Sequence, residues 1–423
     1  MRRRLEALLI LTALSVAGVL TFAGSAPAQG PPGQAQGGLS HRPVCPVSPP
    51  GTAGCNSEIV TDGSGAPLAS TSYSSGYQPS DLASAYNYTL PASGSAWVGN
   101  GQTVAIVDAY RNPNAASDLA AYRAQFGLPP CTVANGCFQE VNQTGAASPL
   151  PAGNTGWGQE ISLDLDMVSA VCPMCRILLV DGNSTSLTDL GTSVNTAASL
   201  HVNAISNSYG TSGEFSSEGS YGDSYYNNHP GIAITASAGD SGYGVEFPAV
   251  SKNVTAVGGT SLSHAGNARG WSETVWSGTG SGCSGYIGQE TWQAAVLSTQ
   301  DKAACSHRIV GDVAAVADPN TGVAVYDSYG SSGGANWFVF GGTSVASPII
   351  ASFYALANAA SNTTSSVPTS YMYSHSSSLN DVTSGSNGRC TSRHSTASAF
   401  LCTARAGYDA TTGMGTPNGL GAF

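Results

Sequence analysis

Two carboxyl side chains that lie four positions apart in the sequence, Glu160 and Asp164, could take part in proton transfer. Apolar residues recur around them at helical spacing, so we expect a helix over 158–171 with both carboxyls on one face, one turn apart. Two carboxyls held this close and shielded from water tend to share a proton, which makes one of them more basic. The alternative is a solvated acidic face without a chemical role, and this helix alone does not exclude it.

A serine that follows a glycine pair, Ser344, could act as a nucleophile. The apolar run over 347–359 predicts a helix that begins close to this serine. Its hydroxyl would then lie at the positive end of the helix, where backbone N–H groups can receive developing negative charge. The alternative is a serine that only caps the helix.

An aspartate in a glycine turn, Asp240, is the third candidate. The apolar run over 232–236 predicts a buried strand, and Asp240 lies just beyond its carboxyl end in the sequence Gly-Asp-Ser-Gly. Open α/β sheets place their ligands at the carboxyl ends of strands. The alternative is an ordinary turn aspartate.

These three candidates need a framework that brings them together. Near-continuous apolar runs alternate with stretches of helical periodicity, which predicts a mostly parallel, doubly wound sheet with helices on both faces, an α/β fold. The expected strands are 102–108, 177–180, 204–208, 232–236 and 254–257, and the expected helices are 118–126, 158–171, 187–200 and 347–359. We expect one domain over 76–423, which opens on a short helix near Pro79 with Ser80 as its N-cap.

The first 75 residues differ in composition from the rest of the chain. Three arginines, an apolar stretch over 8–22 and small residues at 26–28 predict a secretory signal peptide over 1–28. A retained membrane anchor is less favoured, because the apolar stretch is short. Residues 29–75 are rich in Gly, Pro and Ser, lack helical or strand periodicity, and are expected to form a linker or a short pro-segment. We therefore expect a secreted, extracellular protein.

Composition excludes several classes of partner. Only 9% of the 423 residues are charged, and the formal net charge is −11. Phosphate binding needs clustered Lys and Arg, so we expect no nucleic-acid partner. No later stretch of the sequence is long and apolar enough to cross a bilayer, so we expect no membrane partner either. We expect the mature protein to be a monomer.

Ten cysteines fall in five close sequential couples. The couples are Cys45/Cys55, Cys131/Cys137, Cys172/Cys175, Cys283/Cys305 and Cys390/Cys402. An even count with local spacing in an exported chain predicts five short disulfide loops. The Cys-Pro-Met-Cys couple could instead be a redox or zinc pair, but no second such pair accompanies it.

Taken together and in this order, the three motifs resemble those of the sedolisin (serine-carboxyl) peptidases, relatives of the subtilisins. The resemblance covers roughly residues 76–423, and the serine motif extends into an Ala-Ser-Pro sequence that subtilisins share. It implies a subtilisin-like fold and a serine-type endopeptidase acting on proteins or peptides. It also implies residue roles: Ser344 as nucleophile, Glu160 as general base, Asp164 as the group that orients Glu160, and Asp240 as a protonated donor in the oxyanion hole.

Each role has a physical requirement. A glutamate base must be ionised, and a model Glu has a pKa of about 4.3, so this base survives in acid where histidine would be protonated. Asp240 can donate a hydrogen bond only while it is neutral, so its pKa must exceed the working pH. The resemblance therefore implies an acid optimum, which we place at roughly pH 3–5.

Two other interpretations remain open at this point. A subtilisin-type peptidase would need a histidine base in a His-Gly-Thr context, which none of the seven histidines has. A secreted, non-catalytic adhesin would need strands of period two throughout and no privileged serine. Two further residues take minor parts in the resemblance: Asp108 would extend the carboxyl network, and Tyr209 would either flank the substrate or simply pack.

The C-terminal region resembles the sedolisin calcium site. The implied ligands are carboxylates and backbone carbonyls of five residues, namely Asp381, Val382, Arg405, Gly407 and Asp409. Arg405 replaces an expected glycine, which brings a cation close to the ion. The alternative is an acidic disulfide loop that binds no metal.

Overall fold

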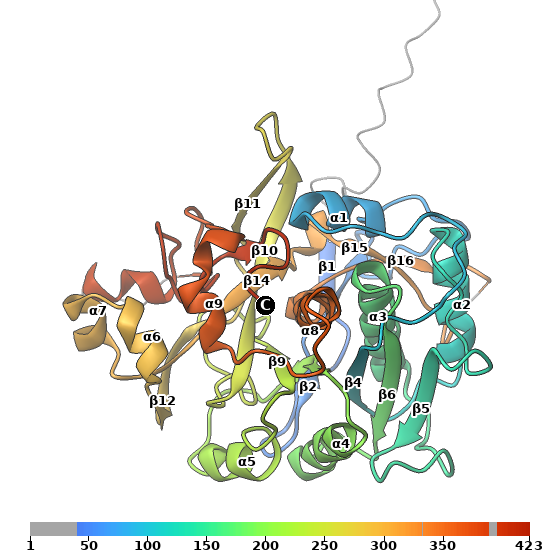
Figure 1. Ribbon diagram of the computed structural model, residues 1–423, viewed down its shortest axis with the longest axis horizontal. Coiled ribbons are helices and arrows are strands. Elements are labelled where there is room, and N and C mark those ends of the chain that lie inside the picture. The colour runs from blue at the N-terminus through green and yellow to red at the C-terminus, as the bar shows by residue number, and fades with distance from the viewer. Residues whose placement is uncertain (1–39, 332, 389–395) are drawn as a thin grey trace, which may run out of the picture. The chain divides into compact units, whose positions relative to one another are not determined.

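The computed structural model describes residues 40–331, 333–388 and 396–423 (Figure 1). The predicted signal peptide over 1–28 lies outside this part of the chain. Within the described ranges, no helix has both the length and the apolar character that crossing a membrane requires.

A central eight-stranded sheet organises the fold (Figure 1). Its strands run in the order β11-β10-β9-β7-β4-β6-β5, with β14 also paired to β10, and every pairing except β10–β11 is parallel. The strands are β4 Thr103–Ala109, β5 Phe138–Asn142, β6 Arg176–Gly182, β7 Ala204–Asn207, β9 Ala233–Ser237, β10 Val254–His264, β11 Trp271–Val275 and β14 Val313–Val316. The predicted mostly parallel α/β sheet is confirmed.

The central strands are covered on both sides. In β7 and β9 every residue is buried, and in β4 only Thr103 is not. Because successive side chains of a strand point to opposite faces, burial of all of them requires packing on both faces of the sheet. This is why these strands show continuous apolar runs in the sequence.

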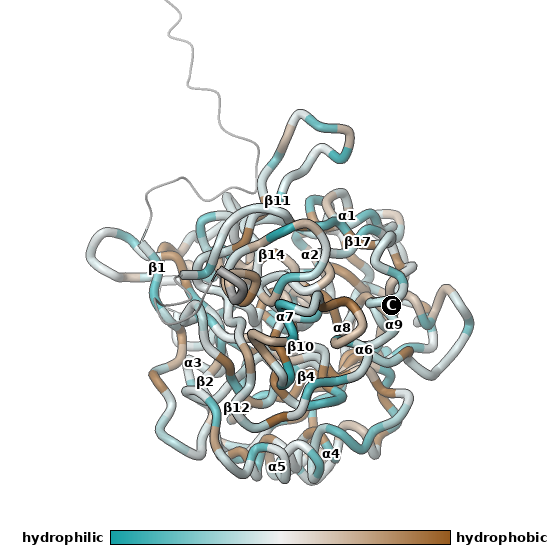
Figure 2. The backbone as a smooth tube through the Cα atoms, turned by 90° about the vertical axis from the view of Figure 1, so that its left-hand side faces the viewer, coloured by the Kyte–Doolittle hydropathy of each residue, from teal (hydrophilic) through white to brown (hydrophobic). Residues whose placement is uncertain are grey.

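Two long helices carry three of the four candidate catalytic residues. Helices α3 and α8 pack against each other, and α8 also contacts β7 and β9. In Figure 2 the hydrophobic tube of α8 lies in the interior. The helices are α1 Pro79–Tyr86, α2 Ala115–Gln125, α3 Thr155–Val171, α4 Leu187–Ser199, α5 Glu218–Tyr225, α6 Thr291–Val296, α7 Thr299–Ala304, α8 Thr343–Ala360 and α9 Ser370–Ser374.

The start of α1 differs from the prediction. The N-cap is Gln78, and its backbone N–H donates to the carboxylate of Asp81 at 3.0 Å. Ser80 therefore lies within the first turn. Pro79 explains the shift, since proline fits the first helical position, where no intrahelical N–H bond is needed.

A second sheet involves the region before residue 76. It has the order β1-β3-β16-β15 and is antiparallel throughout, and its strands are β1 Ser40–Pro43, β3 Glu58–Thr61, β15 Val323–Tyr326 and β16 Trp337–Gly341. A two-stranded ladder also joins β2 Gly54–Cys55 to β8 Tyr209–Gly210. The described part of 29–75 thus contains the short strands β1, β2 and β3, although its sequence shows no helical or strand periodicity. These three strands are only two to four residues long, too short to show a periodicity.

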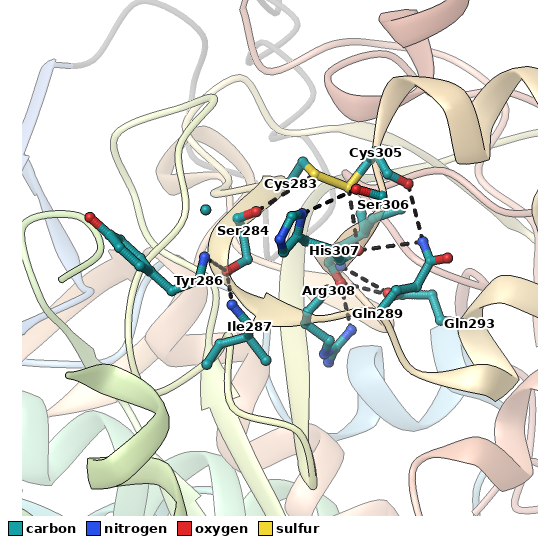
Figure 3. Close-up of a disulfide and its surroundings, with 12 residues drawn as sticks. Cys283, Ser284, Tyr286, Ile287, Gln289, Gln293, Cys305, Ser306, His307 and Arg308 are labelled. Carbon is teal, nitrogen blue, oxygen red and sulfur yellow. Dashed lines mark hydrogen bonds between the residues drawn. A yellow bond between two sulfur atoms is a disulfide. The ribbon is translucent and has the colours of Figure 1, made fainter. Parts of the chain in front are cut away.

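Four predicted disulfides are present: Cys45–Cys55, Cys131–Cys137, Cys172–Cys175 and Cys283–Cys305. The last joins Cys283 in β12 Gly282–Gly288 to Cys305, which caps the end of α7 just before β13 His307–Val310 (Figure 3). Cys402 is disulfide-bonded too, whereas Cys390, its predicted partner, lies outside the described residues. The Cys-Pro-Met-Cys couple is thus a buried disulfide.

Candidate active site

Three elements bring the four predicted catalytic residues together. Glu160 and Asp164 lie one turn apart on α3, Asp240 lies in the turn after β9, and Ser344 is the second residue of α8. The side chains of Glu160, Asp164 and Ser344 have no exposed surface. Asp240 is partly exposed as a residue, but its Oδ2 atom is buried.

Gly342 sets the position of Ser344. Strand β16 ends at Gly341, and Gly342 caps α8 with φ +99°, a conformation that favours glycine. The Ser344 hydroxyl donates a hydrogen bond to the backbone carbonyl of Ser208 at 3.1 Å. Its backbone N–H donates to the carbonyl of Asn56 at 2.8 Å. The helix start thus presents an N–H donor beside the hydroxyl, as predicted from the sequence.

The carboxyl of Glu160 lies close to that hydroxyl. Burial raises the pKa of Glu160 to about 8, and the hydroxyls of Ser344 and Ser57 act in the opposite direction. Neither carboxyl oxygen has a hydrogen-bond partner of normal geometry among the described residues. When this carboxyl is ionised, it has no competing partner and can receive the proton of the serine hydroxyl.

Two more carboxyls adjoin Glu160. Ser208 Oγ lies 2.8 Å from each oxygen of Asp164 and donates to that carboxyl. Burial raises the pKa of Asp164 well above its usual range, and the charges of Asp108 and Glu160 raise it further. Burial and then Glu160 raise the pKa of Asp108 in the same way. Three buried carboxyls this close cannot all be ionised, so they share protons.

Asp240 is anchored through one oxygen. Its Oδ1 accepts hydrogen bonds from the backbone N–H and the hydroxyl of Thr343, at 2.7 and 2.8 Å. Oδ2 is buried and has no partner among the described residues. Burial raises the pKa of Asp240 well above its usual range, with smaller contributions from Glu58 and Glu246. A neutral Asp240 would carry its proton on the unpaired oxygen.

Asn56 also lies within this site. A Cβ atom added to Gly342 would collide with both the carbonyl oxygen of Asn56 and Oδ2 of Asp240. These two oxygens therefore lie against the same bare face of the glycine. The sequence did not point to Ser208 or Asn56 as residues of this site. Backbone pairing between segments far apart in the chain brings both of them here.

A comparison with known families decides the classification. The model of the family described as the subtilase family matches residues 152–399 of the chain. The chain belongs to the subtilase family.

This subtilase is also similar to curated proteins. Kumamolisin of Bacillus sp. (strain MN-32) is 28% identical over an alignment of 372 residues, which covers 81% of this chain and 62% of kumamolisin. Sedolisin of Pseudomonas sp. (strain 101) is 32% identical over an alignment of 197 residues, which covers 43% of this chain and 29% of sedolisin. The chain spans less than two thirds of the length of either relative.

A solved structure shows the same fold. Pseudomonas sedolisin, a serine-carboxyl proteinase complexed with two molecules of pseudo-iodotyrostatin, superposes with a TM-score of 0.65 at 24% sequence identity. The match covers 83% of this subtilase and 96% of that chain. The resemblance to sedolisins and the subtilisin-like fold predicted from the motifs are confirmed.

Tyr209 of this subtilase packs in the interior. It is fully buried, and its hydroxyl donates to Asn207 at 2.8 Å and lies 3.1 Å from the Tyr226 hydroxyl. Its backbone belongs to β8, which pairs with β2. The side chain therefore takes the packing role, and the backbone lines the site.

The residues of the expected calcium site gather around the loop 405–409. Asp381 accepts a hydrogen bond from the backbone N–H of Gly407 at 2.9 Å, and Asp409 accepts one from that of Arg405 at 3.2 Å. The guanidinium of Arg405 forms two hydrogen bonds with Asp301, at 3.0 and 2.8 Å. The cation that replaces the expected glycine is thus paired with another carboxylate.

The other atoms of this loop that could bind a metal ion are oxygens. No group of three or more His, Cys, Asp or Glu side chains that could hold a metal occurs among the described residues. A calcium ion would instead need two carboxylates together with carbonyls of Val382, Arg405 and Gly407, to which no described residue donates a hydrogen bond. Calcium takes six to eight oxygen ligands, many of them carbonyls, so this donor set fits it.

Proposed function

We propose that this subtilase is a secreted, acid-active serine-carboxyl endopeptidase that hydrolyses proteins through an acyl-enzyme intermediate. Ser344 is the nucleophile, Glu160 the general base, Asp164 the residue that orients it, and Asp240 the carboxylic acid of the oxyanion hole. Membership of the subtilase family and the likeness to sedolisins support the serine-peptidase chemistry.

One observation carries the choice of base. The hydroxyl of Ser344 lies beside the buried carboxyl of Glu160. Among the described histidines, no ring is hydrogen-bonded to Ser344, and the His41 ring is paired with Glu58. A carboxyl base is therefore favoured over the imidazole of a subtilisin-type triad.

The steps follow from this arrangement. The Ser344 hydroxyl rotates from the Ser208 carbonyl toward Glu160, gives up its proton to that carboxylate and attacks the peptide carbonyl carbon. The oxyanion accepts hydrogen bonds from the Ser344 N–H and the protonated Asp240. Glu160 then protonates the leaving amine, and water, activated by the same carboxylate, hydrolyses the ester. Asp164 and Asp108 share protons with Glu160 and keep its carboxyl in place.

The pH dependence follows from the two carboxyl functions. Activity requires Glu160 ionised and Asp240 neutral at the same time, so it falls in strong acid when Glu160 takes up a proton and falls at higher pH when Asp240 loses one. Glu160 is covered here by the Asn56–Ser57 peptide, whose removal would admit water and lower the pKa of the carboxyl toward the acid range.

The first experiment tests the nucleophile. Ser344→Ala should lower kcat/KM on a denatured protein substrate at pH 4 by at least about 10³-fold, because the attacking oxygen is removed. Circular dichroism and melting temperature should stay unchanged, since the substitution removes one small buried group. Hydrolysis by the purified variant at the parent rate would contradict the assignment.

Calcium is part of the same proposal. Asp381 and Asp409 would supply carboxylates, and the backbone carbonyls of Val382, Arg405 and Gly407 would complete the shell. The ion would fix the loop 405–409 and take no part in the chemistry.

Secretion and the monomeric state belong to the proposal as well. The disulfides suit an oxidising compartment. No nucleic acid or membrane is needed as a partner, because the substrates are proteins or peptides.

A further inference from the structure

We propose that Glu214 and Glu218 position one wall of the active-site groove by sharing a proton, and that loss of this proton as the pH rises past neutrality releases the wall and weakens substrate binding. The two glutamates are positioning residues, because neither touches the reacting atoms. The effect on substrate binding rests on the proposed function, whereas the link between the two carboxyls does not.

The segment that the pair holds leads from the active site to α5. It follows β8, and its residues Thr211 and Ser212 line the same groove as Asp240. It ends at Glu218, the first residue of α5. A movement of residues 212–217 therefore changes the shape of the groove near the proposed oxyanion hole.

Glu214 ties this segment to β12. Its carboxyl accepts hydrogen bonds from the Ser284 hydroxyl and from the backbone N–H of Gly285, the latter at 2.9 Å. The residues on either side of it, Ser212, Gly213, Ser216 and Ser217, are exposed. The position of the segment over β12 thus depends on the carboxyl of Glu214.

The β12 side of this link is fixed. Cys283, next to Ser284, is joined to Cys305 by a disulfide (Figure 3). Ser284 Oγ also accepts the backbone N–H groups of Tyr286 and Ile287, at 3.0 and 2.8 Å. If the link breaks, the loop is therefore the partner that moves.

The carboxyl of Glu218 lies within hydrogen-bond reach of the carboxyl of Glu214. Glu218 has no exposed surface, and its Oε2 accepts the backbone N–H of Phe215 at 3.2 Å. Its Oε1 is buried, and no donor of the described chain reaches it. Ionised carboxyls only accept hydrogen bonds, so these two can bond to each other only while one of them carries a proton.

The environment keeps that proton on the pair. Burial, and then the charge of Glu214, raise the pKa of Glu218 to about 8. Within the described part of the chain, neither glutamate forms an ion pair. Loss of the shared proton would leave two adjacent carboxylates that repel each other, and the partly exposed Glu214 is the one that can move into water.

Other titratable groups near the pair do not replace the proton. The cavity beside Glu218 is lined by Asp223 on α5, Lys252 before β10 and Tyr286 on β12, and β13, which pairs with β12, adds His307. Lys252 and Asp223 are both exposed and opposite in charge, so their effects on Glu218 oppose each other. The α4 residues that contact α5, Gly191 and Asn195, carry no charge.

The pair therefore adds a second pH-dependent effect to the one that comes from the catalytic carboxyls. Glu160 and Asp240 act on the reacting atoms and govern kcat. A groove wall acts on the binding of substrate and governs KM. The two effects can be separated, because a glutamine in the pair keeps a hydrogen-bond donor that does not titrate.

The first experiment measures hydrogen exchange of residues 212–217 in the full-length Ser344→Ala chain, with and without Glu218→Gln. Comparison at the same pH cancels the intrinsic exchange rate. The two chains should exchange this segment at equal rates at pH 5, and at pH 8.5 the chain with Glu218 should exchange it at least about fivefold faster. The matched control Asp223→Asn removes an exposed carboxyl from the same helix and should follow the chain with Glu218 at both pH values.

Two results of this experiment overturn the proposal. Equal exchange at pH 8.5 means that a shared proton does not hold the segment. A difference as large at pH 5 as at pH 8.5 means that the glutamine itself disturbs the loop. Glu214→Gln supplies the donor from the other partner, so it should reproduce the result, and it takes the place of Glu218→Gln if that variant does not fold.

The second experiment measures KM and kcat on a peptide substrate at pH 5 and pH 8. The KM of the parent should rise about twofold or more, because roughly half of the molecules then lack the shared proton, while the KM of Glu218→Gln stays constant. The ratio of kcat at the two pH values should be the same in both proteins. A parent KM that does not change overturns the positioning role and leaves the peptidase standing. A protein that hydrolyses no substrate refutes the proposed function, and the exchange experiment still decides whether the pair shares a proton.

Discussion

At the scale of single residues, the chemistry of this subtilase depends on carboxyls that have lost their contact with water. Glu160 and Asp108 have no hydrogen-bond partner of normal geometry within the described chain, and Asp164 has the Ser208 hydroxyl. Unpaired buried carboxyls are costly for folding, so they mark a functional site. Ser208 links the parts, because its hydroxyl binds Asp164 while its carbonyl accepts from both Ser344 and Asn56.

Asp240 permits a test of charge at this scale. Asp240→Asn keeps a hydrogen-bond donor for the oxyanion, whereas Asp240→Ala removes it. We expect the alanine variant to lose about 10²–10³ in kcat, the effect of removing one oxyanion donor, and the asparagine variant to lose clearly less. The asparagine variant should also keep its rate at higher pH, because an amide has no proton to lose.

The measurement is a pH–rate profile of the two variants and the parent. Equal losses in the two variants, or a parent profile without a descending limb, would contradict a neutral acid at position 240. Thr343 also bonds Asp240, so melting curves should accompany the kinetics to detect misfolded protein.

At the scale of elements, the sequence predicted the long buried parts of the fold well. The strand predicted over 102–108 and the helix predicted over 158–171 match β4 and α3 within a few residues. Both could be predicted because the apolar pattern continues along the whole strand and over several turns of the helix. The three motifs of the candidate site could be found for the same reason, since each lies at the end or on the face of such an element.

The segment before residue 76 could not be predicted in this way. Strands β2 and β3 have two and four residues, and the partners that join them to the rest of the fold, β8 and β16, lie more than 150 residues away in the sequence. Such pairing depends on tertiary contacts rather than local propensity. Asn56 and Ser208 were missed because only the folded chain brings their backbones together.

The loop 405–409 permits a test of calcium binding at this scale. A chelator should lower the melting temperature of the parent by at least about 3 °C, because an ion that binds only the folded state stabilises it by mass action. Asp381→Asn weakens one ligand, so its melting temperature should respond less to chelator and to added calcium. An unchanged melting temperature of the parent in the presence of chelator would contradict the proposed calcium site.

At the scale of the whole molecule, the low number of ionisable side chains suits an acid environment. The chain has 14 Lys and Arg and 7 His in 423 residues. When the carboxyls are neutralised in acid, only these groups remain charged, so self-repulsion in the folded state stays weak. The buried carboxyls, whose pKa values are raised by burial, also make the folded state more stable in acid than at neutral pH.

Those carboxyls predict that stability falls as pH rises from acid toward neutral. Burial is the main cause that raises the pKa of Asp327 to about 7, of Glu160 and Glu246 to about 8, and of Asp181 to about 9. In the unfolded chain these groups lose their protons near pH 4. Between pH 4 and about 8 the folded state therefore binds more protons than the unfolded state, and the free energy of unfolding decreases with pH.

Thermal melts of Ser344→Ala, which cannot digest itself, measure this effect without loss of material. We expect the melting temperature at pH 8 to be lower than at pH 4 by more than about 5 °C, because several carboxyls contribute in the same sense. Glu246→Gln removes one of them and should flatten the dependence, since an amide of the same shape does not titrate. A melting temperature that rises between pH 4 and pH 8 would mean that these carboxyls are paired and ionised in the folded protein, and that burial does not raise their pKa values.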